Sequence, residues 1–192
     1  MPSTPRSIAK ADRRQALLDA AARLYAERGF TRVSLEDLGA AVGVSGPAVY
    51  RHFDGKQAVL AALLVEVSEG LVEGARRVIA EAPDARSALD ALVAFHVEFA
   101  LSHPDVIVVQ DRDLASLTAD DDQAVRRLQR TYIDAWVDVL ADIHPGVARS
   151  DLRIRARATF GLINSTPHSA RSAARASVRA LLESMALAAL TN

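Results

Sequence analysis

The sequence predicts an all-α fold, and two observations carry that prediction. Apolar residues recur at intervals of three and four along nearly the whole chain of 192 residues, which is the spacing of one face of a helix. The alternation of apolar and polar residues that marks a half-buried strand is nearly absent, and the strong helix formers alanine and leucine dominate. Half of the residues are hydrophobic, enough for a substantial core. We therefore expect helices throughout and no sheet.

The first predicted helix covers residues 10–28. Small and apolar residues between Ala16 and Tyr25 form one stripe along it, as in a helix with one buried face. Gly29 follows directly and can take the left-handed conformation that ends helices. We expect Phe30 to pack back against this helix as the chain turns.

Two short helices are predicted next. Ser34 and Asp37 have the spacing of a capping box, with aspartate in the place of glutamate, and open the first of them. Gly43 closes that helix in a left-handed conformation. Ser45 is the predicted N-cap of the second short helix, which we expect to end near Phe53.

Residues 34–53 together have the spacing of a helix-turn-helix unit. Leu35, Leu38, Val44 and Val49 occupy the positions at which such a unit needs apolar contacts between its helices. The remaining face of the second helix is polar or small, so we expect that helix to enter the major groove of DNA. Taken singly, each of these residues would fit any short helical hairpin; their joint occurrence favours DNA binding.

The rest of the chain is predicted to be helical and punctuated by prolines. A long helix starts after Gly55 and stops before Pro83. Five more helices are predicted, with a break at residues 165–167 before the last, over 85–102, 105–114, 120–143, 151–164 and 171–190. The acidic run at residues 120–122 is interpreted as the favourable charge of a helix start and not as a metal site.

Charge and composition narrow the function. The net charge is only −1, but residues 1–60 carry nine Lys or Arg against six Asp or Glu, so the front of the chain is the better polyanion binder. The absence of cysteine excludes disulfides, thiolate metal sites and cysteine nucleophiles. The polar N-terminus lacks a signal peptide's apolar segment, and no apolar run reaches membrane-spanning length. We expect a cytoplasmic protein with no membrane partner, no cofactor and no metal.

Residues 12–60 resemble the tetracycline-repressor (TetR) family of one-component regulators. The resemblance rests on five short stretches, residues 21–25, Gly29-Phe30, residues 34–38, Gly43-Val44-Ser45, and residues 49–53 followed by Lys56. It implies an N-terminal arm and three-helix DNA-binding domain over 1–55, a connecting helix over 56–82, and a helical effector-binding and dimerisation domain over 83–192. Beyond residue 60 the resemblance is one of architecture only.

The resemblance also implies how DNA is contacted. Tyr50, His52 and Lys56 would bind backbone phosphates, which position a protein without reading sequence. The small residues Gly46 and Ala48 would lie against the groove floor. Base readout would fall to these two and Ser45, with Glu36 and Arg51 as further candidates. The full predicted DNA-binding set is Ser45, Gly46, Pro47, Ala48, Tyr50, Arg51, His52, Lys56, Arg13 and Arg14, with Arg6 and Lys10 in the same basic lead-in. The alternatives are a half-buried tyrosine, ordinary surface residues and a solvated basic tail.

Candidate effector contacts are polar or aromatic groups on apolar helical faces, because ligand pockets combine apolar walls with a few orienting polar groups. The predicted set is His96, Phe99, Gln110, Arg112, Trp136, Phe160 and Asn164. For each an ordinary structural role is the alternative: a core histidine or aromatic, a helix cap, or, for Arg112, an ion pair with a neighbouring aspartate. The apolar segment ending at Arg112 suggests a hydrophobic carboxylate or an acyl thioester.

The predicted function is a ligand-responsive DNA-binding transcriptional regulator, a repressor released from an inverted-repeat operator by a small hydrophobic effector such as an acyl or acyl-CoA compound. Residues 178–190 are apolar on more than one face, which suits a helix shared with a second copy in a homodimer. The alternatives are a DNA-binding dimer without an effector and an α-helical enzyme. The chain lacks phosphate-binding glycine loops, zinc-spaced His-Glu pairs and serine elbows, so we predict that it is not an enzyme.

Overall fold

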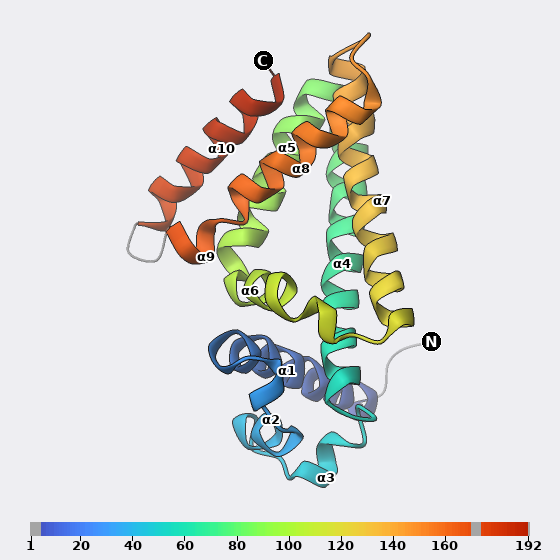
Figure 1. Cartoon of the computed structure of the whole chain (residues 1–192), viewed down its shortest axis with the longest axis vertical. Helices are drawn as coiled ribbons and strands as arrows, with labels where there is room; N and C mark the ends of the chain where they lie inside the picture. The colour runs from blue at the N-terminus through green and yellow to red at the C-terminus, as the bar shows by residue number, and fades with distance from the viewer. Residues whose placement is uncertain (1–4, 170–173, 192) are drawn as a thin grey trace.

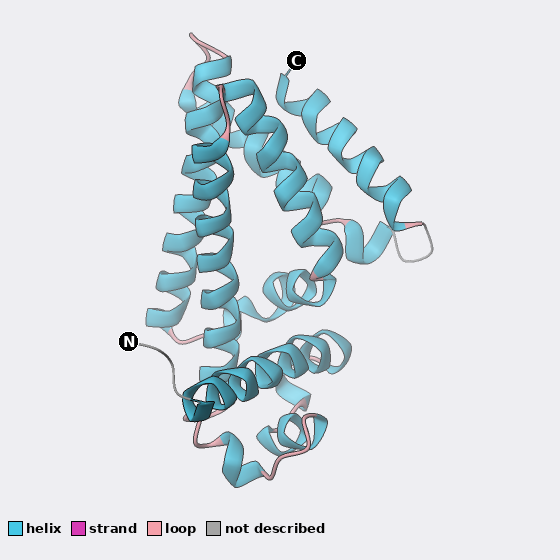
Figure 2. Cartoon of the chain, turned by 180° about the vertical axis from the view of Figure 1, so that it is seen from behind, coloured by secondary structure: helices cyan, strands magenta, loops and turns pink. Residues whose placement is uncertain are grey.

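The chain folds into a small group of helices at one end and a larger group of long helices at the other (Figure 1). A computed structural model describes residues 5–169 and 174–191, with side chains from Lys10 onward. Within these residues every regular element is a helix, and no strand occurs (Figure 2). The elements are α1 Pro5–Arg28, η1 Phe30–Arg32, α2 Leu35–Ala41, α3 Gly46–Val49, α4 Lys56–Glu81, α5 Ala85–Ser102, α6 Pro104–Asp113, η2 Leu114–Ser116, α7 Ala119–Ile143, α8 Arg149–Ile163, α9 Thr166–Ser169 and α10 Arg175–Thr191. The all-α prediction is confirmed.

Helices α1, α2 and α3 form one end of the molecule, and the longest helix, α4, rises from them (Figure 1). α4 runs beside α7 for most of its length, and α5, α8 and α10 complete the other end. Helix α6 lies between the two ends and packs on α1. This arrangement places one short helix in contact with both halves of the chain.

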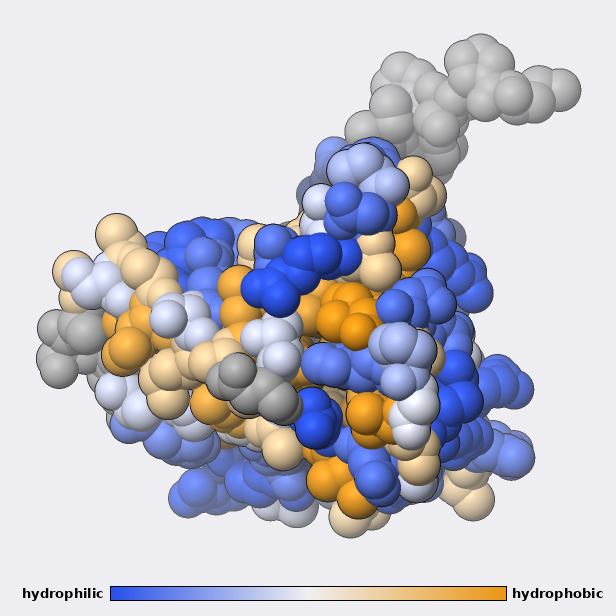
Figure 3. All heavy atoms as spheres, turned by 90° about the horizontal axis from the view of Figure 1, so that it is seen from above, coloured by the Kyte–Doolittle hydropathy of each residue, from blue (hydrophilic) through white to orange (hydrophobic). Residues whose placement is uncertain are grey.

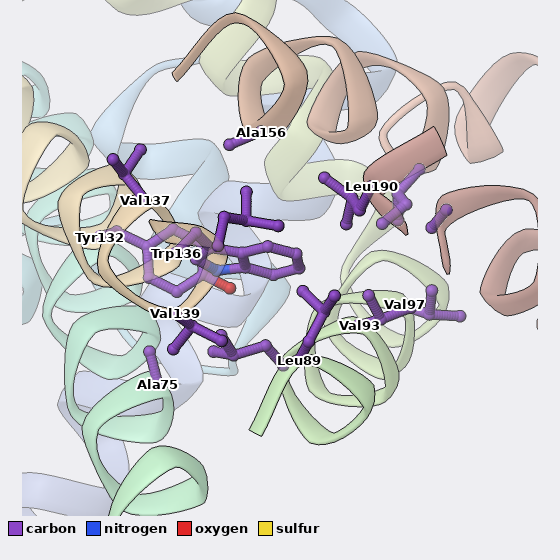
Figure 4. Close-up of a cluster of buried hydrophobic side chains, with 14 of the residues drawn as sticks. Ala75, Leu89, Val93, Val97, Tyr132, Trp136, Val137, Val139, Ala156 and Leu190 are labelled. Atoms are coloured by element: carbon purple, nitrogen blue, oxygen red, sulfur yellow. The ribbon is translucent and has the colours of Figure 1, made fainter. Parts of the chain in front are cut away.

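Two hydrophobic clusters correspond to the two ends. The first joins α1, α2 and α3 to the start of α4, and it also takes in Val106 and Val109 from α6. The second surrounds Trp136 of α7, which lies among Leu89 of α5, Ala156 of α8 and Leu190 of α10 (Figure 4). Because α4 and α6 contribute buried side chains to both clusters, displacement of either helix changes the packing of both.

Several element boundaries differ from the sequence prediction. Helix α1 begins at Pro5 instead of residue 10, because a proline in the first turn removes only an amide proton that has no helical partner. The segment predicted as a break at residues 165–167 instead contains the short helix α9, with Pro167 near its start. The last helix, predicted from residue 171, begins at Arg175; residues 170–173 lie outside the described part of the chain.

The end of the molecule opposite α1, α2 and α3 carries apolar side chains among hydrophilic ones on its surface (Figure 3). Exposed large hydrophobic residues include Ile154 of α8 and Leu181 and Met185 of α10. In the described residues, no single helix has the length and apolar character needed to cross a membrane; one pair, Ala85–Ser102 with Pro104–Ser116, meets that test by length and composition but is bent by 84°.

Candidate DNA-binding and effector sites

The first short helix of the helix-turn-helix is fixed by local hydrogen bonds. The Ser34 side chain accepts a hydrogen bond from the Asp37 amide at 3.1 Å, and the Asp37 carboxylate accepts one from the Ser34 amide at 2.8 Å. This reciprocal pair is the predicted capping box. The Asp37 carboxylate also accepts a hydrogen bond of 2.7 Å from the Ser34 hydroxyl. This bond, together with the one from the Ser34 amide, holds the pKa of Asp37 below its usual value, so the carboxylate stays charged at the helix N-terminus, where negative charge is favourable.

The turn between the two helices depends on two glycines. Gly43 has a φ of 72°, a left-handed conformation that other residues adopt only with strain. At Gly39 a Cβ atom would lie 2.7 Å from the Val44 carbonyl oxygen and 3.1 Å from Val49 Cγ2. The absence of a side chain at Gly39 therefore allows α3 to approach α2 closely.

The second short helix is a single helical turn, α3, which covers Gly46–Val49. Turn residues 50–52 follow it, and a hydrogen bond of 3.1 Å from the Phe53 amide to the Val49 carbonyl closes this turn. Ser45 occupies the N-cap position, but its side chain makes no capping hydrogen bond, so the prediction that Ser45 caps the helix holds for its place and not for its hydroxyl. Pro47 lies in the first turn, as predicted.

The two faces of this unit have different environments. Val49 and Phe53 are buried in the first hydrophobic cluster. Tyr50 is 56% exposed, and its exposed neighbours on the outer side include Ser45, Pro47 and Arg51, with Gly46, Ala48 and His52 half-buried. The outer face can therefore approach a groove without losing its packing.

His52 lies within a group of cations. Burial lowers its pKa, and the positive charges of Lys10, Arg13, Arg14 and Arg51 lower it further. Those charges come from the start of α1 and the end of the helix-turn-helix, so the two segments form one basic surface. A basic surface of this kind binds phosphates. Arg6, from the same lead-in, has a side chain outside the described residues.

Two of the predicted DNA-binding cations, Lys56 and Arg14, also stabilise the domain. Lys56 Nζ donates hydrogen bonds of 3.0 Å to the carbonyl oxygens of Phe30 and Thr31 and lies 4.7 Å from the Phe30 ring centre. Arg14 forms an ion pair with Glu66 of α4. Since an ammonium has three N–H donors, a phosphate contact from Lys56 would use the third.

A cavity of about 230 Å³ lies in the second half of the chain, bounded by α4, α5, α6, α7 and α8. It brings together five of the predicted effector contacts, namely His96, Phe99, Gln110, Phe160 and Asn164. Its walls are mostly apolar or aromatic, and among the described lining residues Arg157 is the single charged one. The cavity therefore has the character of a small-ligand site.

His96 is the most deeply buried polar residue of the cavity. Its Nδ1 lies 3.1 Å from the Tyr132 hydroxyl, and its Nε2 is buried with no hydrogen-bond partner, as is Oδ1 of Asn164. Burial lowers the pKa of His96 to about 4, so the imidazole is neutral at pH 7. Buried polar atoms without partners are rare in native proteins and call for an explanation.

The other two predicted effector contacts lie outside the cavity lining. Trp136 is fully buried behind the cavity, with its ring centre 4.9 Å from that of Phe160. Arg112 points toward the DNA-binding end, where it donates hydrogen bonds to the carbonyl oxygens of Ala26 and Tyr25 and pairs with Asp113 at 2.8 Å. Arg112 therefore forms the ion pair with a neighbouring aspartate that the sequence predicts as the alternative to an effector contact.

Sequence reasoning missed four polar residues that line the cavity: Ser68, Gln129, Tyr132 and Arg157. Tyr132 carried a usable signal, because it precedes Trp136 by four positions and therefore shares its helical face. Arg157 carried none, since it lies in a helix rich in arginine.

A helix-turn-helix unit joined to a helical domain with an apolar cavity is the architecture of a one-component DNA-binding regulator. Residues 17–63 match the model for bacterial regulatory proteins of the tetR family, and residues 82–190 match the tetracyclin repressor-like C-terminal domain. The chain therefore belongs to the TetR family, and it is a DNA-binding transcriptional regulator and not an enzyme. Regulators of this family bind DNA and dimerise.

Relatives agree with this assignment. The transcriptional repressor KstR2 of Rhodococcus jostii (strain RHA1) is 31% identical over 147 residues, which span 76% of this chain and 72% of that protein. A TetR-family regulator from Bordetella parapertussis 12822 is 26% identical and superposes with a TM-score of 0.83, over 92% of this chain and 93% of that one. FadR of Bacillus subtilis, solved in complex with stearoyl-CoA, has 16% identity and a TM-score of 0.74, over 91% and 98% of the chains, and shows the fold alone.

Proposed function

We propose that this protein represses transcription by binding an inverted-repeat operator as a homodimer, and that a small hydrophobic effector entering the cavity releases it. Residues 1–55 would bind DNA, 56–82 would connect, and 83–192 would hold the effector and the dimer interface, in the cytoplasm. The observation that carries the proposal is the position of α6, which lines the cavity and is hydrogen-bonded to α1.

The path from cavity to DNA is short. Val106, Ile107 and Gln110 of α6 line the cavity, and Arg112, two residues beyond Gln110, bonds to the last turn of α1. An effector that displaces α6 therefore displaces α1 and the basic surface that α1 shares with α3. Release follows if the effector binds the displaced state more tightly than the DNA-bound state.

Helix α10 supports the homodimer. One of its faces buries Leu182, Ala186 and Leu190 within its own chain, while Leu181 and Met185 are 60% and 44% exposed on another. A helix that is apolar on two faces suits an interface between two copies. A two-fold dimer places its recognition helices about one turn of DNA apart, so an inverted repeat is expected.

Acyl compounds are the first effector class to examine. The structural relative FadR of Bacillus subtilis was solved with stearoyl-CoA, and the cavity of this chain has apolar walls and Arg157. A cavity of about 230 Å³ is smaller than typical ligand pockets of about 300–1,000 Å³. It would hold part of an acyl chain, and a coenzyme A group would remain outside.

The test is fluorescence anisotropy with DNA flanking the protein's own gene, across a salt series. Tyr50→Ala and Arg13→Ala should weaken binding, because both side chains lie on the exposed basic surface. Arg86→Ala is the matched control, since Arg86 is an exposed arginine of α5 with an i,i+4 ion pair. Specific, salt-sensitive binding that only the first two variants weaken supports the proposal; the absence of specific binding overturns it.

Titration of the same complex with fatty acids and acyl-CoA compounds tests the second half. Release at stoichiometric effector supports ligand control, whereas DNA binding unaffected by these and by other small hydrophobic compounds supports the alternative of a dimer without an effector. Trp136 is the chain's one tryptophan, and its ring packs against His96 and Phe160. A change in its fluorescence therefore reports whether a compound enters the cavity.

A further inference from the structure

We infer that the effector carries a hydroxyl group, which accepts a hydrogen bond from His96 and donates one to Asn164 on a compact, uncharged ring scaffold. The inference deepens the proposed function and rests on it. It depends on the hydrogen-bonding capacity of three neighbouring side chains and on the size of the space beside them.

The proton on the His96 imidazole can be assigned from its neighbour. Nδ1 of the neutral ring lies 3.1 Å from the hydroxyl of Tyr132. If the phenol donates to Nδ1, the ring proton is on Nε2 and both groups are used. If Nδ1 donated instead, the phenolic proton would have no acceptor among the described residues. The first arrangement is therefore favoured, and it makes the unpartnered Nε2 an N–H donor.

The second unpartnered atom has the opposite capacity. Asn164 Oδ1 is a buried acceptor for which no donor meets the geometry of a hydrogen bond. The Asn164 side chain nevertheless acts on His96 as a weak hydrogen-bond acceptor, which opposes the fall in the imidazole pKa. No hydrogen bond of normal geometry joins the two side chains directly. One ligand atom that can both accept and donate would satisfy both of them.

A hydroxyl oxygen has this double capacity, with one proton and two lone pairs. A ketone oxygen can accept from His96 but leaves Asn164 Oδ1 without a donor. A carboxylate brings only lone pairs and a negative charge against that same oxygen. Leaving a buried polar group unpaired carries its full desolvation penalty, so both alternatives fit this pair less well than a hydroxyl.

The surrounding space determines the scaffold. The cavity holds about 230 Å³. Three aromatic rings of its lining surround His96, with centres 5.9 Å (Phe99), 5.7 Å (Tyr132) and 4.8 Å (Phe160) from the imidazole centre. Aromatic walls of this kind bind flat or compact apolar rings. A one- or two-ring alcohol or phenol matches both the volume and the polar pair.

The test compares four compounds on one bicyclic scaffold by titration calorimetry with the full chain: indan-5-ol, indane, 1-indanone and indane-5-carboxylate. Indan-5-ol is expected to bind at least about tenfold more tightly than each of the others, because a site built for a hydroxyl strongly rejects analogues that lack it. His96→Phe and Asn164→Leu keep the size of the side chains and should abolish that preference without weakening the binding of indane.

Gln123→Leu is the matched control, since Gln123 is an exposed glutamine of the same helix α7 and lies outside the cavity lining. It should retain the preference for the alcohol, and unchanged melting temperatures and DNA affinity of the free variants show that they fold. Equal binding of alcohol and ketone, tighter binding of the carboxylate, or no binding of any compound overturns the inference. The proposed function is judged separately, by specific, salt-sensitive DNA binding that Tyr50→Ala and Arg13→Ala weaken.

Discussion

Arg112 of α6 donates a hydrogen bond of 3.2 Å to the carbonyl oxygen of Ala26 in α1, although 86 positions separate the two residues. The same guanidinium donates to the Tyr25 carbonyl and pairs with the largely buried Asp113 at 2.8 Å. A cation at the C-terminal turn of a helix meets carbonyl groups that lack helical partners. The link therefore ties the effector-binding half of the chain to the DNA-binding half.

Replacing Arg112 with methionine should weaken both stability and coupling. The variant leaves the Asp113 carboxylate buried without its partner, so the free energy of unfolding should fall by about 1–3 kcal/mol. The change in DNA affinity caused by an effector should also become smaller, because the hydrogen bonds that join α6 to α1 are lost. Urea denaturation and anisotropy with and without effector measure the two effects, and Arg86→Met serves as the surface control. Unaltered stability would mean that Asp113 finds another donor.

The helix-turn-helix could be predicted from the sequence because its determinants are local. Ser34 and Asp37 are three positions apart, and their hydrogen bonds are the ones that the capping-box pattern predicts. The positive φ of Gly43 likewise follows from its place at a helix end. Side-chain detail was less predictable: Ser45 has the N-cap position without the capping hydrogen bond.

The effector site could be predicted only in part, because its contacts join distant segments. Helical periodicity indicated that His96 faces the interior, but its partner Tyr132 lies 36 positions away, and no local pattern connects them. Arg112 shows the same limit, since its contact with Tyr25 spans 87 positions. A charged residue after an apolar run has the same sequence pattern whether it points into a cavity or toward a neighbouring helix.

Gly39→Ala should destabilise the helix-turn-helix. The new methyl group would lie 2.7 Å from the Val44 carbonyl oxygen, and backbone atoms cannot move away cheaply, so a loss of about 1–3 kcal/mol is expected. Gly70→Ala in α4 is the matched control, because nothing lies within 4 Å of its added Cβ and alanine favours a helix by about 1 kcal/mol. Thermal unfolding of both variants compares them; equal melting temperatures would show that α2 and α3 can separate without loss.

DNA affinity should rise as pH falls, through His52. Burial and nearby cations hold its pKa below the usual value in the free protein, so the ring is neutral at pH 7. DNA phosphates beside the ring favour its charged form, so binding takes up a proton. Affinity should then rise as the pH falls below the pKa of the DNA-bound imidazole, by at most about tenfold per pH unit for one proton. Anisotropy with His52→Gln should give a flatter profile; an identical pH dependence would place His52 away from phosphate.

Leu181→Asp should weaken the homodimer. Leu181 is 60% exposed on α10, and burying such a side chain in an interface contributes about 1.5–3 kcal/mol, which a buried carboxylate would cancel. Sedimentation should show a dimer dissociation constant raised at least about tenfold. Ala115→Asp, an exposed position in η2, controls for added charge. A dimer equally stable in both variants would move the interface away from this face of α10.

His96 should make the folded state sensitive to mild acid. Its pKa is about 4 in the folded protein and about 6.5 in an unfolded chain, so the unfolded state binds more protons between these values. The contribution of neutral His96 is therefore complete above about pH 6.5 and is lost progressively as pH falls toward 4, by roughly 3 kcal/mol in total. Urea denaturation of the wild type and of His96→Phe over pH 4–7.5 measures this difference. If both lose stability in parallel, the acid sensitivity arises from other groups and the burial of His96 is less complete than its surroundings indicate.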